Sequence, residues 1–419
     1  MNMKMRQNNG TGCTACKRGV QGEGLGAEGR FPYPHNSSRL RYNCSHFVLC
    51  YAVSTMPESS AESTAFFRFW DIVRYLLVAL MTGVLIWWSF FYTPPLYASK
   101  EHSGKTMGTD YIVKVARFPE TGDWKKLAND IQSRLDTLDQ KMSTYKSDSE
   151  VCRFNAFTST EEWFSVSGET AYVVQVALEI SQLSGGAFDI TVAPLVRHWG
   201  FGAGSRPGQT KSFEELTSEA ALLKEQTGYE KLSVRLDPPA LKKAIPELSI
   251  DLSAIAKGFA VDCLAELLEA QKITDYLVEV GGEVRSKGKK GKDKEGKDME
   301  WIVGVENPLQ SSAIQQKLVL GNKSLATSGS YLQRLQVEGR SISHIIDPRT
   351  GMPVGESELV SVAVMASDCI RADAWATAMF VLGEQRGGTL ASQHGIAVLF
   401  LLKNGNEIVE VPSKNWSQK

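Results

Sequence analysis

Asp368–Ala378 reads DCIRADAWATA, and the interpretation of the whole chain starts from these eleven residues. The stretch is rich in Ala, so the sequence predicts a helix. Asp373 and Thr377 are four residues apart, a spacing that puts both side chains on one helical face. A carboxylate beside a hydroxyl supplies the oxygen ligands that Mg²⁺ prefers, often together with substrate phosphates. Taken alone, the pattern also fits an ordinary surface helix, so the surrounding chain must decide.

Composition excludes some functions at the outset. The 419 residues carry a net charge of -1 at pH 7, with 46 Lys and Arg against 47 Asp and Glu. This balance gives no electrostatic case for binding nucleic acid, and we expect no nucleic-acid partner. Cys13 and Cys16 form a C-x-x-C, but no second pair or His cluster follows at zinc spacing. We therefore assign this pair no metal or redox role.

The N-terminal region, residues 1–71, is predicted to be a disordered or non-native extension. Residues 1–55 carry Gly, Asn, Ser and Arg without a sustained period. Met56 opens a plausible start of its own, so we hypothesise that Met56 is the true initiator. N-terminal sequencing of the natural protein tests this hypothesis, and a product beginning at Met1 would contradict it.

Residues 72–93 are predicted to form a transmembrane anchor. Tyr75–Tyr92 is a run of eighteen residues without a charge, which is long enough to span a bilayer. A cleaved signal peptide is the alternative, but it requires a shorter apolar run and a small-residue cleavage site, whereas Thr93-Pro94-Pro95 follows here. The flanking basic residues are nearly balanced, so the positive-inside rule does not decide the orientation.

Residues 105–403 are predicted to form one α+β domain, and residues 404–419 a C-terminal tail. Strands and helices are mixed without regular βαβ alternation, which is why the class is α+β. The expected strands are 107–116, 275–280, 283–285, 301–306, 316–320, 359–365 and 397–402. The expected helices are 123–142, 167–184, 253–270 and 369–382. Gly185 and Gly186 are expected to end the second helix.

Ser253–Gly258 is a candidate phosphate site. Ser253 is expected to cap a helix that runs to about Ala270. A helix N-terminus offers free N–H groups and partial positive charge, and Lys257 adds a full one. The glycine spacing is not that of a Walker motif, and a capped helix with a surface lysine is the alternative.

Four further motifs each have a functional and a structural interpretation. Gly281-Gly282-Glu283 either approaches a ligand closely or makes a tight turn. The hydroxyls of Ala326–Ser330 either hold phosphate oxygens or belong to a turn. His344, before an Asp-Pro turn, is a general base or a structural histidine. Trp199 and Phe201 either stack on a flat ring or pack a core. Together the motifs indicate Mg²⁺ with a ligand that bears phosphate and a ring.

Seven blocks in order resemble the ApbE family, the FAD:protein FMN transferases, from about Met107 to Leu402. The blocks are MSTY from Met142 with SEVCRFN from Ser149, GGAFDITVAPLVRHWGFG from Gly185, IDLSAIAKGFAVD from Ile250, VEVGGEVRSKG from Val278, ATSGSY from Ala326, SHIIDPRTGMPV from Ser343 and ADAWATA from Ala372.

The resemblance implies an activity. Such enzymes split FAD at its pyrophosphate with Mg²⁺, attach FMN through a phosphoester to a Thr of a client protein, and release AMP. The implied clients are subunits of redox complexes of the Nqr and Rnf types. The resemblance also implies an inner-membrane location with the catalytic domain in the periplasm. Many members are lipoproteins, whereas here no Cys follows the apolar run directly.

The resemblance also assigns roles to residues, in an FAD site expected between subdomains of the α+β fold. Asp373 and Thr377 would bind Mg²⁺, with the Ala254 carbonyl as a third ligand. His344 would be the catalytic base, acting together with Asp373. The expected FAD-binding residues are Tyr145, Asp189, Lys257, Asp262, Glu279, Gly281, Gly282 and Thr327.

Two other functions remain as alternatives. An FAD pyrophosphatase would use water where the transferase uses a Thr hydroxyl; because both share the metal site, the sequence does not separate them. A flavin-binding protein without turnover is the second alternative. The pairing of Asp373 with Thr377 argues against it, since binding alone needs no metal pair.

Overall fold

The computed structural model describes residues 61–91, 97–204, 211–310, 313–330, 334–355 and 357–416. The chain divides into two compact units, one up to Phe91 and one from Tyr92 onward, and each is described by itself. The predictions for residues 1–60, Met56 included, lie outside the described residues, as does the Thr93-Pro94-Pro95 segment.

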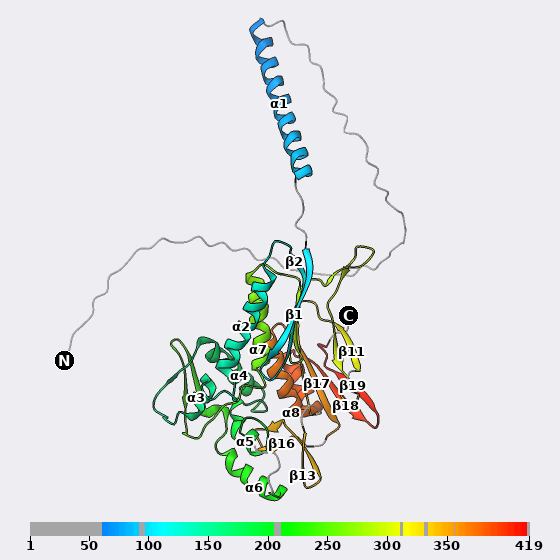
Figure 1. Ribbon diagram of the computed structural model, residues 1–419. Coiled ribbons are helices and arrows are strands. Elements are labelled where there is room, and N and C mark those ends of the chain that lie inside the picture. The colour runs from blue at the N-terminus through cyan, green and yellow to red at the C-terminus, as the bar shows by residue number, and fades with distance from the viewer. Residues whose placement is uncertain are drawn as a thin grey trace, which may run out of the picture. The chain divides into compact units, whose positions relative to one another are not determined.

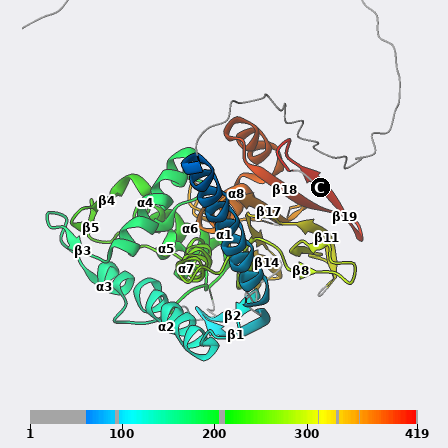
Figure 2. The same cartoon turned by 90° about the horizontal axis from the view of Figure 1, so that it is seen from above.

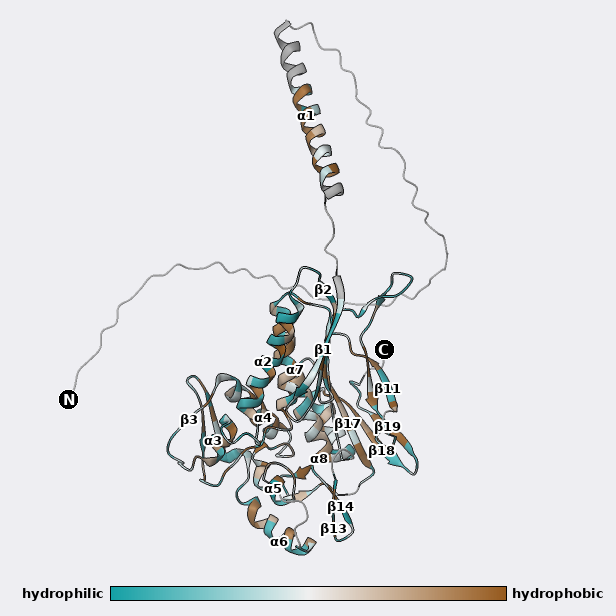
Figure 3. Ribbon diagram, in the orientation of Figure 1, coloured by the Kyte–Doolittle hydropathy of each residue, from teal (hydrophilic) through white to brown (hydrophobic). Residues whose placement is uncertain are grey.

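The first unit contains the helix α1, Ala61–Phe91. Its window Trp70–Trp87 has a mean hydropathy of 1.6 and is long enough to cross a bilayer. Figure 3 shows the apolar character of this window. The helix is therefore compatible with the predicted single anchor, although a signal sequence passes the same test of length and composition.

The second unit is built on an eight-stranded sheet in which every pair of neighbours is antiparallel (Figure 1). In spatial order the strands are β1 Tyr97–Thr106, β2 Thr109–Pro119, β6 Tyr276–Val280, β7 Glu283–Lys287, β12 Ser324–Gly329, β17 Leu359–Ala366, β18 Ala397–Asn404 and β19 Glu407–Pro412. Short hairpins and helical crossovers join these strands, so the predicted α+β class is confirmed.

Four helices enclose the main core on one side of this sheet (Figures 1 and 2). They are α2 Trp124–Met142, α4 Gly168–Leu183, α7 Ala256–Ala270 and α8 Cys369–His394. On α2, the residues spaced for one helical face, Leu127, Ile131, Leu135 and Leu138, are all buried, as predicted. Asp123 and Ser167 cap α2 and α4 through their side chains, which explains where these helices begin.

The opposite face of the sheet is covered by a second, smaller core. The antiparallel pair β10 Ile302–Glu306 and β11 Ile314–Val319 supplies much of it. Val305 and Leu318 pack there with Trp416 near the C-terminus. Since the sheet has a core on each face, alternate residues of its strands belong to different environments.

A third cluster lies around short elements that follow α4 in the chain. It includes Trp199 and Phe201, both buried, so of the two interpretations of these aromatics the structure supports core packing. Around it lie α5 Ala193–His198, α6 Phe213–Lys224, β13 Arg334–Val337, β14 Arg340–Ser343, β15 Ile346–Asp347 and β16 Met352–Pro353. The remaining short elements are α3 Glu150–Ala156, β3 Phe164–Ser165, β4 Leu232–Leu236, β5 Pro239–Lys243, β8 Gly291–Lys292, β9 Asp298–Met299 and the 3-10 helices η1 Ile190–Val192 and η2 Tyr229–Lys231.

The C-terminal part differs from the prediction in two places. Gly383, with φ of 76°, interrupts α8, so the predicted helix 369–382 corresponds to its first segment and a second segment continues to His394. Beyond residue 403, where a tail is expected, β19 pairs with β18 and extends the main sheet. The strand reads EIVEVP, in which two apolar residues stand together and break the strict alternation, so an edge strand of this kind is hard to see in sequence.

Candidate functional site

The site begins where α7 crosses α8. The Gly258 N–H donates to Asp373 Oδ2 at 2.9 Å. A Cβ at position 258 would lie 2.3 Å from the Cys369 carbonyl oxygen and 2.8 Å from the Asp373 Cβ. Only glycine permits this approach, which brings the first turn of α8 against the first turn of α7.

Three charged groups from three elements meet at this crossing. Lys257 Nζ of α7 lies 3.0 Å from Glu283 Oε1 of β7 and 3.7 Å from Asp373 Oδ1 of α8. Glu283 and Asp373 are each 2% exposed, whereas the Lys257 side chain is 26% exposed. The lysine is therefore the most exposed member of the cluster.

Burial and proximity shift the proton affinities of these groups. Burial raises the pKa of Asp373 despite the nearby Lys257 ammonium. Burial likewise raises the pKa of Glu283, while the Lys257 ammonium opposes this shift and favours the carboxylate. Burial disfavours the Lys257 ammonium, but the two carboxylates outweigh it and hold the pKa of Lys257 above its ordinary value. Lys257 is accordingly a permanent cation at neutral pH.

Thr377 lies on α8 four residues after Asp373, on the predicted helix. Its hydroxyl is 3.0 Å from Ser328 Oγ on β12. Thr327, the residue expected at the site, precedes Ser328 on the strand and points to the other face, since Ala326 belongs to the main core and Leu325 to the second. Ser328 is thus the β12 hydroxyl that meets the α8 face.

The start of α7 differs from the prediction. The helix begins at Ala256 without a side-chain cap, and Ser253 does not cap it. The Ser253 N–H and hydroxyl both donate to Asp251 Oδ1. Ser253 is therefore part of a local turn instead of capping the helix. The Gly258 N–H, four residues after Ala254, is taken by Asp373. The Ala254 carbonyl oxygen therefore does not accept the usual helical hydrogen bond from the Gly258 N–H.

These groups fit a hard divalent cation. The Asp373 carboxylate, the Thr377 hydroxyl and the Ala254 carbonyl are all oxygen donors, the chemistry that Mg²⁺ requires. Across the described residues, no group of three His, Cys, Asp or Glu side chains is placed to hold a metal. A cation here would complete its coordination with water or phosphate oxygens, as Mg²⁺ usually does.

The β6–β7 turn lies beside the lysine. Gly281 and Gly282 have φ of 59° and 100°, so the turn requires glycines. A Cβ on Gly281 would lie 3.1 Å from the Lys257 Cδ and 2.7 Å from the Thr109 Cγ2. The motif is therefore both a tight turn and a close approach to Lys257.

Glu279 is not brought into the cluster. It pairs across the hairpin with Val284, which belongs to the core on the opposite face of the sheet. Its Oε1 accepts from the Gly282 N–H at 2.8 Å and thereby holds the turn. Burial raises the pKa of this carboxyl.

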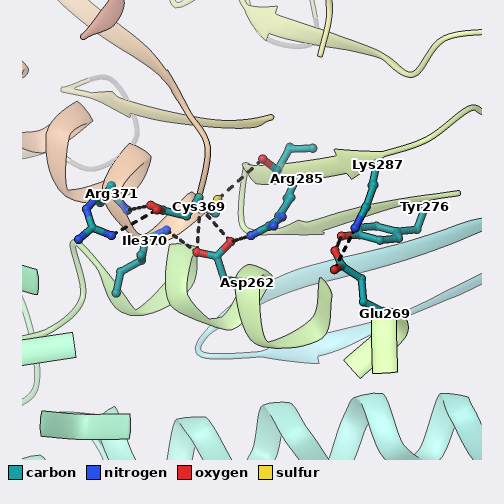
Figure 4. Close-up of polar contacts among 10 residues, drawn as sticks. Asp262, Glu269, Tyr276, Arg285, Lys287, Cys369, Ile370 and Arg371 are labelled. Atoms are coloured by element: carbon teal, nitrogen blue, oxygen red, sulfur yellow. Dashed lines mark hydrogen bonds and ion pairs between the residues drawn. The ribbon is translucent and has the colours of Figure 1, made fainter. Parts of the chain in front are cut away.

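Asp262 anchors α8 on α7 (Figure 4). Its carboxylate accepts from the backbone N–H of Cys369 at 2.8 Å and of Ile370 at 2.9 Å, and it pairs with Arg285 Nη1 at 2.5 Å. Three donors surround this buried carboxylate. In the structure its part is to position the helix that carries Asp373 and Thr377.

Asp189 is likewise held by donors of the protein itself. Its Oδ1 accepts from the Thr191 N–H and hydroxyl, and its Oδ2 from the Tyr229 N–H at 2.8 Å. Burial raises its pKa to about 6. Tyr145 is the opposite case, since it is 73% exposed just after α2 and offers an open ring face.

His344 follows β14 at a braced turn. Its ring lies 6.2 Å from the Phe201 ring in an edge-on contact. Three residues further on, Asp347 and Arg349 form a two-pronged ion pair that stiffens the Asp-Pro turn. The half-buried imidazole is thus held on a rigid support.

Sequence reasoning missed Glu283, Ser328 and the role of Gly258. Glu283 belonged to a noted motif but was not chosen as a site residue. A signal was present: Glu283, Arg285 and Lys287 alternate along one strand, which places three charges on one face of a sheet. Three charges on a face that must pack against a helix indicate partners of opposite charge.

The fold and the site define an α+β protein with an acid–lysine cluster at a helix crossing on an antiparallel sheet. The family model described as ApbE family matches residues 107–400. The chain belongs to the ApbE family.

Proteins with established names are similar to this chain over most of its length. The FAD:protein FMN transferase of Vibrio cholerae is 40% identical over 315 residues, which covers 75% of this chain and 90% of that protein. The FAD:protein FMN transferase of Escherichia coli K12 is 38% identical, covering 75% and 85%.

Solved structures give the same result for the fold. The flavin transferase ApbE from Vibrio cholerae superposes with a TM-score of 0.67 at 38% identity, covering 77% of this chain and 99% of that one. The apo form of the flavinyl transferase ApbE from Pseudomonas stutzeri has the same TM-score at 32% identity, covering 78% and 98%.

Proposed function

We propose that this protein is a Mg²⁺-dependent FAD:protein FMN transferase. It would cleave FAD at the pyrophosphate, attach FMN through a phosphoester to a Thr of a client protein, and release AMP. The observation that carries the proposal is the cluster at the α7–α8 crossing, where Lys257 lies 3.7 Å from Asp373. Membership of a family whose named relatives are FAD:protein FMN transferases supports it.

The residues at the crossing would have two different roles in binding a diphosphate. Asp373, Thr377 and the Ala254 carbonyl would hold the cation, and the partly exposed Lys257 would contact phosphate oxygens. When bound, Mg²⁺ would neutralise charge that builds on the pyrophosphate. Lys257 adds a fixed positive charge, and positioning and charge neutralisation supply most of the catalysis in phosphoryl transfer.

The remaining predicted residues would line or support the FAD site. Gly281 and Gly282 would let the ligand approach the backbone beside Lys257. Tyr145 would stack on a ring of the ligand through its exposed face. Asp189, Asp262, Glu279 and Thr327 would support the site from behind.

His344 would accept the proton of the acceptor Thr as its oxygen bonds to the FMN-side phosphorus. The bond from that phosphorus to the AMP oxygen breaks, and AMP leaves. Water in place of the Thr hydroxyl would give free FMN and AMP. The transferase and the pyrophosphatase therefore differ only in the attacking oxygen.

The client and the location form a further part of the proposal. The helix α1 is long and apolar enough to serve as a single anchor in the inner membrane. We infer a periplasmic catalytic domain and clients that are subunits of Nqr- or Rnf-type redox complexes. The acceptor would then be presented at the same membrane.

The test uses the full chain in detergent with FAD, Mg²⁺ and a co-expressed client subunit. We expect AMP release together with a mass gain of one phosphoester-linked FMN on a Thr of the client. EDTA should stop both. AMP and free FMN without any modified client would identify a hydrolase instead, and undiminished cleavage of FAD in EDTA would contradict the metal requirement.

A further inference from the structure

The contact between β7 and α7 is a ladder of three ion pairs. Alternate residues of β7 face α7, and each meets a side chain of opposite charge. The pairs are Glu283 with Lys257 at 3.0 Å, Arg285 with Asp262 at 2.5 Å and Lys287 with Glu269 at 3.0 Å. Figure 4 shows the second and third pairs. In the first pair alone the acid is on the strand and the base on the helix.

A third charge competes for the lysine of the first pair. Lys257 Nζ is within hydrogen-bonding distance of Glu283 Oε1, at 3.0 Å, but 3.7 Å from Asp373 Oδ1. The other oxygen of Asp373 is held by the Gly258 N–H. Two buried carboxylates thus share one ammonium, and Glu283 holds it more closely.

Glu283 also carries an unsatisfied oxygen. Its Oε2 is fully buried and has no hydrogen-bond partner within the described part of the chain. A buried carboxylate with one unpaired oxygen is unfavourable for folding, so stability alone does not explain an acid at this position. With all three groups ionised the cluster carries one net negative charge, which favours the binding of an added cation.

We propose that Glu283 is a positioning residue that holds the Lys257 ammonium away from Asp373 and so keeps the Asp373 carboxylate available to a divalent cation. This inference rests on the proposed function. Without Glu283, Lys257 would close the 3.7 Å gap and pair with Asp373. The ammonium would then occupy the oxygen that the cation requires.

The test measures Mn²⁺ binding by electron paramagnetic resonance on the full chain in detergent, without FAD. Glu283→Gln preserves shape and removes the charge. We expect its Kd for Mn²⁺ to rise roughly tenfold, as is usual when a partner behind a metal ligand is lost. Glu269→Gln is the matched control, being the same substitution in the third pair of the same ladder. Its Kd should stay within about twofold of the wild-type value.

A double-mutant cycle separates positioning from simple loss of charge. If Glu283 acts by restraining Lys257, adding Glu283→Gln to Lys257→Met should leave the Kd for Mn²⁺ unchanged within about twofold. Lys257→Met alone should bind Mn²⁺ at least as tightly as the wild type, because the competing ammonium is gone. A tenfold loss that persists in the Lys257→Met background would overturn the proposal in favour of bulk electrostatics.

Two further outcomes complete the test. If Glu283→Gln does not fold, Glu283→Asp takes its place, since the shorter carboxylate reaches Lys257 less well; an unchanged Kd would overturn the proposal. If the wild type transfers FMN but Glu283→Gln has the same Kd for Mn²⁺ as the wild type, this inference alone is overturned. If Glu283→Gln weakens Mn²⁺ binding as expected but the wild type transfers no FMN, the result counts against the proposed function instead.

Discussion

The contact between β7 and α7 has a buried inner end and a more exposed outer end. Each end carries a Lys–Glu pair with the same distance between nitrogen and oxygen. Lys257 and Glu283 form the buried pair, with side chains 26% and 3% exposed. Lys287 and Glu269 form the outer pair, with side chains 39% and 33% exposed. Both pairs are 3.0 Å long, so their geometry alone does not distinguish them.

The difference lies in what surrounds each pair. Water screens the outer pair, and Glu269 also accepts a bond from the Tyr276 hydroxyl, so this end contributes modestly to stability. The inner pair has Asp373 as a third charge, and both of its carboxylates are almost fully buried. Low dielectric strengthens every interaction there, and under the proposed function the same chemistry would form a binding site.

Asp262 belongs to the middle pair, between the two ends. Its substitution should have the largest effect on the free energy of unfolding. Asp262→Ala leaves Arg285 and the first N–H groups of α8 without their buried acceptor. We expect a loss of about 3–5 kcal/mol in the free energy of unfolding. Chemical denaturation of the full chain measures it. A change below about 1 kcal/mol would contradict an anchoring role.

Asp373→Ala tests the inner end directly. Removing the carboxylate should lower AMP release from FAD roughly 10²–10³-fold, because the charge that stabilises the cation is lost. Assays at saturating FAD measure the change. The variant also leaves the buried Gly258 N–H without its acceptor, so we expect about 1–3 kcal/mol of destabilisation as well. Unchanged turnover in a folded variant would remove Asp373 from the site.

Gly258→Ala tests the close approach that creates the inner end. The new methyl would meet the backbone oxygen of Cys369, which cannot move freely, so we expect about 1–3 kcal/mol of destabilisation. Gly388→Ala, in the second segment of α8, is the matched control, because nothing lies within 4 Å of the added methyl. The control should be neutral or slightly stabilising. Equal effects of the two substitutions would argue against a steric requirement for glycine at the crossing.

Glu269→Gln at the outer end should have the smallest effect. The amide still accepts from Tyr276, and only the screened pair with Lys287 is lost. We expect less than about 1 kcal/mol on unfolding and unchanged activity. Thermal denaturation in low and high salt measures it, and the difference should shrink as salt rises. A large loss of activity would show that the outer end belongs to the site.

Local patterns predicted much of the fold. The buried face of α2 and the helix that carries Asp373 and Thr377 follow from spacing along the chain. The hairpin around Gly281 and Gly282 follows from turn chemistry. The start of α7 was predicted wrongly, because the side chain of Asp251 competes for Ser253. Such local competition depends on backbone geometry that spacing does not express.

The sequence by itself determined the class of fold, the helical face that carries Asp373 and Thr377, and the ordered motifs of the family. Each depends on residues a few positions apart, and the 3.6-residue and two-residue periods connect such residues physically. Only the tertiary structure decided that Glu283, Lys257 and Asp373 form one cluster. Lys257 and Asp373 are 116 positions apart in the chain. They meet because Gly258 lets the two helices approach closely. Contacts of this kind depend on packing, which no local pattern records.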